Sequence, residues 1–260
     1  MPNNPRRLVP LDGATNFRDL GGYETTDGHH VRWDKLYRSN SLARLSDADL
    51  DVLRRLGIRL VCDFRGDEEH EAAPSRVPED DGLEILRLPV WPEASLTQRM
   101  MVMAGRIQVD EIIDGYIAVY RAFARHHGDA FAAFLHRLAE GASYPVVFHC
   151  SAGKDRTGFA AALVLTAIGV PLETVFADYL LTNDLWAPLG AEALRNSRFA
   201  AIVENMDEDA RGAYLSARPE YLQASLDAIH EAHGSFDAYF REGLGIGEET
   251  REALRAALLE

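Results

Sequence analysis

The chain has 260 residues, and 47% of them are hydrophobic, which is enough to bury one sizeable core. Its formal net charge of −14 at pH 7 argues against nucleic acid as a partner, because a phosphate backbone binds to a basic surface. The two cysteines, Cys62 and Cys150, are too few for a disulfide scaffold and fit a cytoplasmic protein.

Targeting and linker signals are absent from the printed sequence. Residues 1–10 lack the apolar core of a Sec signal peptide, and the longest apolar stretch, at 159–170, is shorter than the roughly 20 residues of a membrane span. We therefore expect a cytoplasmic protein without a transmembrane segment, and we leave open export by a route that needs no Sec signal. No repeat or linker divides residues 1–260, so we expect one domain.

Before residue 170, predicted strands alternate with predicted helices. A capping box of Ser46 and Asp49 begins a helix that runs to Arg55 and is ended by Gly57. Strands are predicted at 59–64 and 83–90, and apolar residues at helical spacing predict helices at 110–127 and 130–140. An apolar, β-branched run at 144–148 predicts a further strand, and an alanine- and leucine-rich helix follows the next loop.

After residue 170 only helices are predicted. They cover 172–181, 191–216, 219–233 and 248–259, and an acidic patch at 207–209 interrupts the second of them. Strands that alternate with helices, followed by helices alone, predict an α/β fold in which a sheet is flanked by helices.

Cys150 and Arg156 lie six positions apart where the 144–148 strand gives way to the following helix. Residues 150–156, here called the cysteine loop, place a thiol at the start of the loop and a guanidinium in the first turn of the helix. Unpaired N–H groups of such a loop and helix N-terminus converge on one point and bind an anion. The same field favours thiolate over thiol, so the loop suits attack by a thiolate on a tetrahedral oxyanion.

Each residue of the loop has an expected part in this chemistry. Arg156 can hold two oxygens of the anion with its planar fork, and Gly153 lets the backbone come close to it. The hydroxyl of Thr157 can hydrogen-bond the thiolate and ease its departure. Ser151, Ala152 and Lys154 complete the predicted substrate-binding set.

The segment 149–158 resembles the phosphate-binding loop of protein-tyrosine phosphatases, and its Lys154-Asp155 pair resembles their atypical bacterial branch. Further segments agree with that branch in the same order along the chain, at 16–22, 36–39, 56–58, 178–180 and 183–184. The resemblance therefore covers most of the chain.

This resemblance implies the sheet of a cysteine phosphatase with a helical cap, or lid, after the cysteine loop at about residues 185–218. It implies a phosphomonoester hydrolase that forms a phosphocysteine on Cys150, needs no metal or cofactor, and releases inorganic phosphate as product and inhibitor. Phosphotyrosine proteins are the implied substrates. Phosphoserine or phosphothreonine proteins and phosphoinositides are further classes, because a lysine at the position of Lys154 is also typical of phosphoinositide phosphatases.

Three acidic residues are candidates for the general acid that protonates the leaving oxygen. Asp155 is favoured, because a carboxylate beside a phosphate is repelled and so favours its protonated form, although it could instead pair with an arginine. Asp63 ends a predicted strand, where α/β sheets place their ligands, but it could be a helix cap or a partner of Arg65. Glu93 follows Trp91-Pro92 and resembles the acid loop of other tyrosine phosphatases, but it could lie in an ordinary surface turn.

Supporting roles are expected for residues around the loop. His149 is expected to hold the loop backbone by hydrogen bonds, with a merely buried histidine as the alternative. Cys62 is expected to pack in the core, facing away from Asp63 on the same strand. Structural ion pairs near the N-terminal turn are expected for Arg18, Asp19 and Arg38.

Two other function classes are alternatives to an active phosphatase. A phosphate-binding pseudophosphatase is disfavoured because the loop holds every chemical group that turnover needs. A rhodanese-like sulfurtransferase also places a cysteine before a helix, but its loop usually differs in length and lacks the Arg156-Thr157-Gly158 ending.

Overall fold

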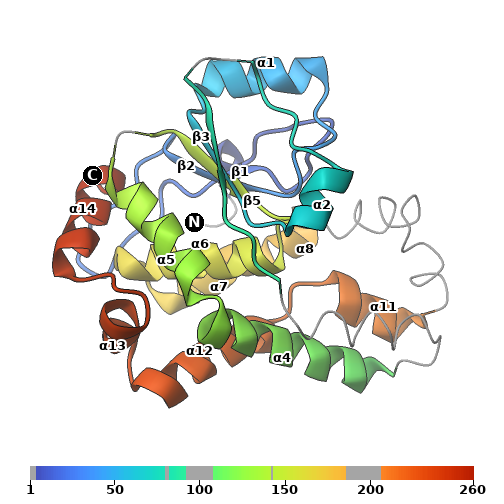
Figure 1. Cartoon of the computed structure of the whole chain (residues 1–260), viewed down its shortest axis with the longest axis vertical. Helices are drawn as coiled ribbons and strands as arrows, with labels where there is room; N and C mark the ends of the chain where they lie inside the picture. The colour runs from blue at the N-terminus through green and yellow to red at the C-terminus, as the bar shows by residue number, and fades with distance from the viewer. Residues whose placement is uncertain (1–3, 80–81, 92–107, 142, 186–205) are drawn as a thin grey trace.

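The computed structural model describes residues 4–79, 82–91, 108–141, 143–185 and 206–260. Its sheet has five strands in the order β1-β2-β5-β3-β4 (Figure 1), with β1 antiparallel to β2 and the other neighbours parallel. The strands are β1 (Arg18–Asp19), β2 (Leu36–Ser39), β3 (Leu60–Asp63), β4 (Glu84–Arg87) and β5 (Val146–His149).

The register of the parallel strands brings polar residues together at one edge of the sheet. His149, at the end of central strand β5, lies level with Ser39 of β2 and with Asp63 of β3. Asp63 in turn lies level with Arg87 of β4. The carboxyl ends of parallel strands form the usual ligand crevice of an α/β sheet, and the cysteine loop leaves β5 at this edge.

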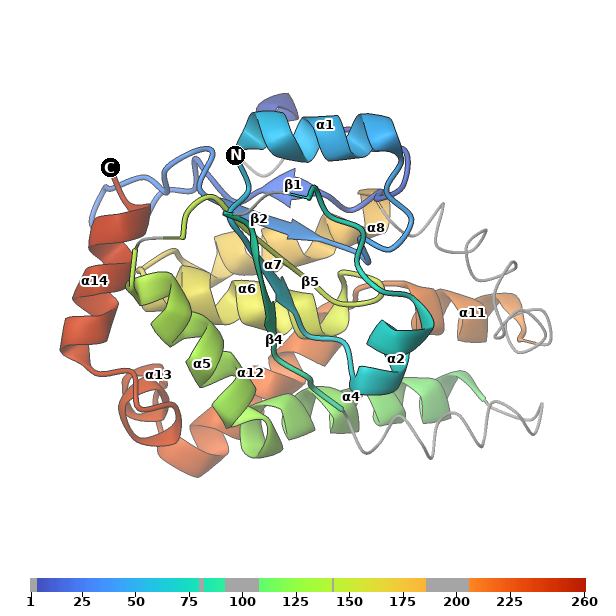
Figure 2. The same cartoon turned by 45° about the horizontal axis from the view of Figure 1, so that its top comes forward.

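Side chains that alternate along the strands divide the core into two layers, because successive residues of a strand face opposite sides of the sheet. Val61 and Val147 pack with Leu50 and Leu53 of α1 (Asp47–Leu56), whereas Cys62 faces the opposite layer. Figures 1 and 2 show α1 on one face of the sheet and the larger group of helices on the other.

That larger group contains most of the remaining helices. They are α4 (Val109–His126), α5 (Gly128–Ala139), α6 (Asp155–Ala167), α7 (Leu172–Leu180), α11 (Glu208–Leu215), α12 (Pro219–His233) and α14 (Glu248–Leu258). Helix α12 packs along α4 and also contacts α6 and α7, and α14 packs on α5. Short helical segments are η1 (Pro5–Arg7), α2 (Asp67–Ala72), α8 (Thr182–Leu185), α13 (Phe236–Ala238) and η2 (Tyr239–Gly243).

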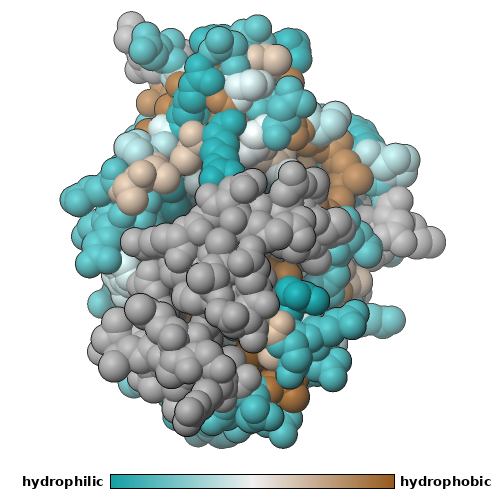
Figure 3. All heavy atoms as spheres, turned by 90° about the vertical axis from the view of Figure 1, so that its right-hand side faces the viewer, coloured by the Kyte–Doolittle hydropathy of each residue, from teal (hydrophilic) through white to brown (hydrophobic). Residues whose placement is uncertain are grey.

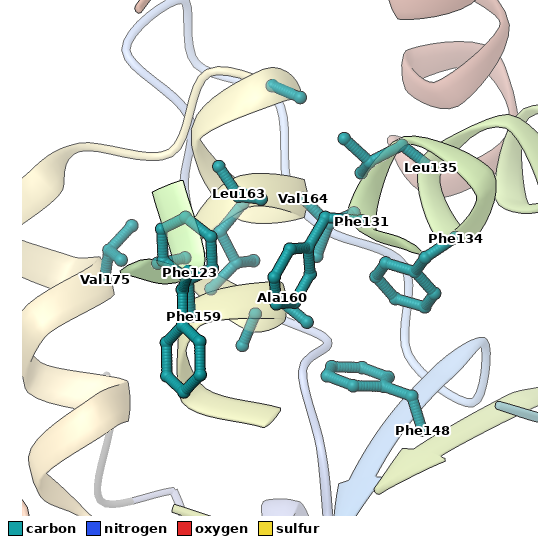
Figure 4. Packing of buried hydrophobic residues seen from close by; sticks show 14 of the residues in the cluster. Phe123, Phe131, Phe134, Leu135, Phe148, Phe159, Ala160, Leu163, Val164 and Val175 are labelled. Carbon is teal, nitrogen blue, oxygen red and sulfur yellow. The ribbon is translucent and has the colours of Figure 1, made fainter. Parts of the chain in front are cut away.

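Helix α6 is buried on nearly all sides, which explains why its sequence is apolar without a polar stripe. Figure 4 shows the rings of Phe123, Phe131, Phe134, Phe148 and Phe159 gathered between α4, α5, β5 and α6. The ring centroids of Phe131 and Phe159 are 4.8 Å apart at an interplanar angle of 85°, an edge-to-face pair. This packing fixes the helix that carries Arg156.

Most predicted elements are confirmed with shifts of a few residues, and α12 has the predicted bounds of 219–233. The short strands β1 and β2, the helix α2 and the short helical segments at 236–243 were not predicted. At the acidic patch, Asp207 caps the start of α11 by accepting the N–H of Ala210 at 2.7 Å, and most of the part of the predicted 191–216 helix that precedes the patch lies outside the described residues. Most of the predicted lid lies outside the described residues.

The described surface is mainly hydrophilic on the face turned toward the viewer in Figure 3, with hydrophobic residues gathered in small patches. None of the described helices combines the length and the apolar character that crossing a membrane would require.

Candidate active site

Cys150 lies directly after β5, and only 1% of its surface is exposed. Helix α6 begins at Asp155, so the N-terminus of the helix lies at the end of the cysteine loop, as predicted. The first N–H groups of a helix have no intrahelical acceptor, which makes this end of α6 suitable for holding an anion next to the thiol.

The carbonyl groups of the loop are held by side chains from the N-terminal segment. The carbonyl oxygen of Gly153 accepts from Arg38 Nη2 at 2.8 Å and from Asn16 Nδ2 at 3.1 Å. In a trans peptide the N–H points opposite to the C=O, so a carbonyl held on the outer side turns the following N–H inward. Gly153 has φ of 67°, and a Cβ there would lie 2.5 Å from the carbonyl oxygen of Ser39. Glycine is therefore required at this position.

The structural ion pairs expected for Arg18 and Arg38 are confirmed. Their partner is Asp178 of α7 and not Asp19. Arg38 Nη1 lies 2.6 Å and Arg18 Nε 3.1 Å from the Asp178 carboxylate, and all three side chains are buried. Burial alone raises the pKa of Asp178, but the charges of both arginines lower it well below its ordinary range. Asp19 instead accepts the backbone N–H groups of Gly21 and Asp34.

Arg156 forms a two-pronged ion pair with Glu69 of α2, a residue that the sequence analysis did not single out. Nη1 and Nη2 lie 2.6 and 3.0 Å from the two carboxylate oxygens. Glu69 also accepts the hydroxyl of Ser151 at 2.5 Å. Burial opposes ionisation of Glu69, but the hydrogen bonds from Arg156 lower its pKa to about 2. Within the described residues no hydrogen bond reaches Arg156 Nε, so the edge formed by Nε and Nη2 can take two oxygens of a phosphate.

Asp63 is buried and accepts hydrogen bonds from three basic side chains. Its carboxylate accepts from Arg65 Nε and Nη2 at 3.0 and 2.8 Å, from Arg87 Nη1 at 2.9 Å, and from His70 Nδ1 at 3.0 Å. Burial alone raises the pKa of Asp63, but the Arg65 hydrogen bonds and the nearby charges lower it well below its ordinary range. An ionised carboxylate with these partners has no proton to donate, which fits the structural alternative considered above.

His149 supports the loop backbone. Its Nδ1 lies 3.1 Å from the carbonyl oxygen of Cys150, so this nitrogen carries the proton and donates, while Nε2 accepts from Ser75 at 3.2 Å. Burial lowers the pKa of His149 from 6.5 to about 4, so the ring is neutral at pH 7. The thiol-bearing residue is thus tied through His149 to the 73–78 segment.

Lys154 has different partners from the predicted phosphate contact. Its ammonium donates to the carbonyls of Tyr214 and Ser216, at 2.8 and 3.3 Å, and lies 4.3 Å from the ring centre of Tyr116. It therefore caps the C-terminal end of α11 and links that helix to the cysteine loop. Burial lowers the pKa of Lys154, and Asp155, at 3.6 Å, opposes the change.

The remaining predicted residues are placed as follows. Asp155 accepts a hydrogen bond from Tyr120 at 3.0 Å, and its side chain is one-fifth exposed. Ala152 accepts from Asn16 at 3.4 Å. Thr157 is buried, and its hydroxyl has no hydrogen-bond partner in the part of the chain that the structure describes. Glu93 lies outside the described residues, and Cys62 is a free, buried core residue, as expected.

A sequence model of the tyrosine phosphatase family matches residues 9–260. The chain belongs to the tyrosine phosphatase family. It is 34% identical over 279 residues to the triple specificity protein phosphatase PtpB of Mycobacterium tuberculosis, which covers 96% of this chain and 98% of that protein. It is 36% identical over 242 residues to a Cupriavidus necator protein named as a candidate tyrosine-protein phosphatase, covering 93% of this chain and 85% of that protein.

A solved structure of P. aeruginosa TpbA in complex with phosphotyrosine also matches the chain, at 17% sequence identity and a TM-score of 0.33. The match covers 87% of this chain and 98% of that one.

Four residues around Cys150 and Arg156 were missed by sequence reasoning or given no role. Glu69, Asn16, Asp178 and Tyr120 come from segments far from the loop in sequence. Asn16 and Asp178 lie in the segments that carry the resemblance, which was a usable signal. For Glu69 the signal was the acidic run after Gly66, which forms the first turn of α2.

Replacement of Glu69 by glutamine tests whether this residue orients Arg156. We expect kcat/KM for an aryl phosphate to fall about 10- to 100-fold, because the guanidinium loses its charged partner. Glu68→Gln, at the exposed neighbouring position, is the matched control and should leave kcat/KM nearly unchanged. A rise in kcat/KM for Glu69→Gln would instead mean that Glu69 competes with substrate for Arg156.

The pH dependence of stability tests the neutral state of His149. Its pKa is about 4 when folded and near 6.5 when unfolded, so the unfolded state binds more protons between these values. The stability that comes from the neutral ring is present above about pH 6.5 and is lost as the pH falls toward 4. The loss is on the order of 3 kcal/mol.

Urea unfolding of wild type and His149→Gln at about pH 7 and about pH 4.5 measures this loss. Burial raises the pKa of Asp19 to about 6, so Asp19 also titrates in this range, and its effect on stability has the opposite sign. Both proteins contain Asp19, so the difference between them isolates the effect of His149. We expect wild type to lose its advantage over the variant at the lower pH. An equal change in both proteins would contradict the assignment.

Proposed function

We propose that Cys150 attacks the phosphorus of a phosphomonoester and forms a phosphocysteine, which water then hydrolyses to free phosphate. The observation that carries the proposal is the placement of a buried thiol and an oriented guanidinium at the N-terminus of α6. Membership of the tyrosine phosphatase family supports it independently.

Arg156 is proposed to hold the phosphate through Nε and one hydrogen of Nη2, while Glu69 stays bound to Nη1 and to the other hydrogen of Nη2. The contacts with Glu69 keep the fork in place before substrate arrives, so charge that builds on the equatorial oxygens meets a prepared partner. The N–H groups of the loop at Ser151, Ala152 and Gly153 are proposed to bind the same oxygens. The unpaired Thr157 hydroxyl is proposed to stabilise the departing thiolate.

Asp155 is proposed as the general acid that protonates the leaving oxygen. It lies at the N-terminus of α6 beside Arg156, and its side chain is partly exposed. Asp63 is a poorer candidate because three basic side chains hold its carboxylate in the ionised form. Glu93 is not placed by the described residues and remains the alternative.

Phosphotyrosine proteins are the proposed substrates, with phosphoserine or phosphothreonine proteins and phosphoinositides as further classes. The triple specificity in the name of the mycobacterial relative supports a broad range. The case for phosphoinositides from Lys154 is weakened, because its ammonium is bound to backbone carbonyls of the chain itself. Contact with a lipid headgroup would require Lys154 to leave them. A cytoplasmic location is part of the same proposal.

Steady-state kinetics with phosphotyrosine peptide, phosphoserine peptide and a soluble phosphoinositide test the proposed function. We expect turnover to be highest with the phosphotyrosine peptide and to fall by at least about 10⁴-fold in Cys150→Ser, because the hydroxyl is a far weaker nucleophile. Cys62→Ala is the matched control for loss of a buried thiol and should keep activity. Turnover that survives Cys150→Ser would contradict the proposal, and cyanide-dependent thiocyanate formation from thiosulfate would indicate the sulfurtransferase.

A further inference from the structure

A line of buried hydroxyl groups ends on the carboxyl group of Asp155. The hydroxyl of Tyr120, on α4, lies 3.0 Å from Asp155 Oδ1. The hydroxyl of Tyr179, on α7, lies 2.7 Å from that of Tyr120. Both tyrosines are at least 99% buried, so water does not compete for these hydrogen bonds.

The direction of this line follows from the chemistry of its ends. Burial, followed by the charge of Asp155, raises the pKa of Tyr120 well above its ordinary value, so its hydroxyl keeps its proton and donates to the carboxyl oxygen. Since its one proton is given to Asp155, Tyr120 can only accept in its hydrogen bond with Tyr179, and Tyr179 donates. Every donor points toward Asp155, an arrangement in which each bond strengthens the next.

Other groups around Asp155 leave one of its oxygens open. Lys154 Nζ lies 3.6 Å from the same Oδ1 that Tyr120 contacts. No hydrogen bond or ion pair reaches Oδ2 from the residues that the structure describes. The further titratable groups that sense the charge of Asp155 are Tyr116 on α4, Tyr179 on α7, Tyr221 on α12 and Arg156 on α6.

We propose that Tyr120, held in place by Tyr179, is a positioning residue for the general acid: it fixes Asp155 Oδ1 so that Oδ2 carries the transferable proton toward the cysteine loop. The proposal rests on Asp155 being the acid. The two oxygens of the carboxyl group are otherwise equivalent, and the contacts made by Oδ1 distinguish it from Oδ2. Close packing supports the geometry, because a Cβ at Gly158 would lie 2.8 Å from the Tyr179 ring.

Each proton that moves in the reaction has a donor and an acceptor in this arrangement. In the first step the Cys150 sulfur forms a bond to phosphorus, the phosphorus–oxygen bond breaks, and the proton on Oδ2 moves to the leaving oxygen. The carboxylate that remains keeps its hydrogen bond from Tyr120 and its ion pair with Lys154 at Oδ1. In the second step Oδ2 takes a proton from water as that water attacks phosphorus, and the sulfur leaves as thiolate.

The pH profile of kcat/KM for Tyr120→Phe tests the proposal, because phenylalanine keeps the ring and removes only the hydroxyl. We expect about a 10-fold loss with phenyl phosphate, a poor leaving group, and less than about a 2-fold loss with an aryl phosphate whose leaving group needs little protonation. The alkaline limb should move up by as much as about one pH unit, because the carboxylate loses a donor and the protonated form persists to higher pH.

Two further variants keep the test independent of folding defects. Tyr179→Phe should change the profile in the same direction by a smaller amount, about 2- to 3-fold with phenyl phosphate. Tyr239→Phe is the matched control, because its buried hydroxyl donates to the carbonyl of Ala124 on the same helix α4 but not to Asp155. It should leave the profile and the leaving-group dependence unchanged.

Asp155→Asn separates failure of this proposal from failure of the acid assignment. If Asp155 is the acid, the variant loses the alkaline limb, and adding Tyr120→Phe causes no further loss. If the variant keeps the limb, Asp155 is not the acid and both proposals fall. A third outcome is that Asp155→Asn loses the limb while Tyr120→Phe lowers kcat/KM equally for both substrates or keeps the wild-type pH profile. In that case Asp155 remains the acid and the positioning role of Tyr120 is overturned.

Discussion

The buried ion pairs of Asp178 with Arg18 and Arg38 are the constraint on which the active site depends. Two guanidinium groups beneath the loop would be strongly unfavourable without a carboxylate between them, and Asp178 from α7 supplies it. Once neutralised, Arg38 can donate to the carbonyl of Gly153 and hold the loop in its turn. Because removal of one partner from such a pair costs on the order of 3–5 kcal/mol, this network couples loop geometry to stability of the whole fold.

The cysteine loop therefore has both its backbone and its guanidinium group held in place by the rest of the fold. Its carbonyls are held by Arg38 and Asn16, and its guanidinium is fixed by Glu69, so little reorganisation remains when phosphate arrives. The basic side chains at this edge of the sheet are each paired with a carboxylate. His149, neutral because it is buried, adds support for the backbone of Cys150 without adding charge.

Sequence could predict the parts of this site that are local in the chain. The six-residue spacing of Cys150 and Arg156 predicts the anion site because a loop between a strand and a helix N-terminus is a local feature of the sequence. The helix that became α12 was predicted with its bounds because Pro219 begins it and Gly234 ends it. Helix α2 was missed because its six residues carry no apolar stripe, and Glu69 was missed with it.

Residues whose roles depend on contacts across the fold were beyond sequence reasoning. Nothing in the local sequence of Tyr120 shows that its hydroxyl meets Asp155, since the contact depends on how α4 packs on α6. The same limit applies to Lys154, because the carbonyls at the end of α11 that its ammonium contacts lie far from it in sequence. For Asp63 the sequence did offer the correct partner, because Arg65 is only two positions away.

The most direct test of this account is rapid acid quenching of wild-type enzyme during turnover of an aryl phosphate, followed by mass spectrometry of the peptides. The account predicts a phosphate adduct on the peptide that contains Cys150, formed and consumed at rates compatible with kcat, and none on the peptide that contains Cys62. Turnover without an adduct on Cys150, or with an adduct on another residue, would contradict it.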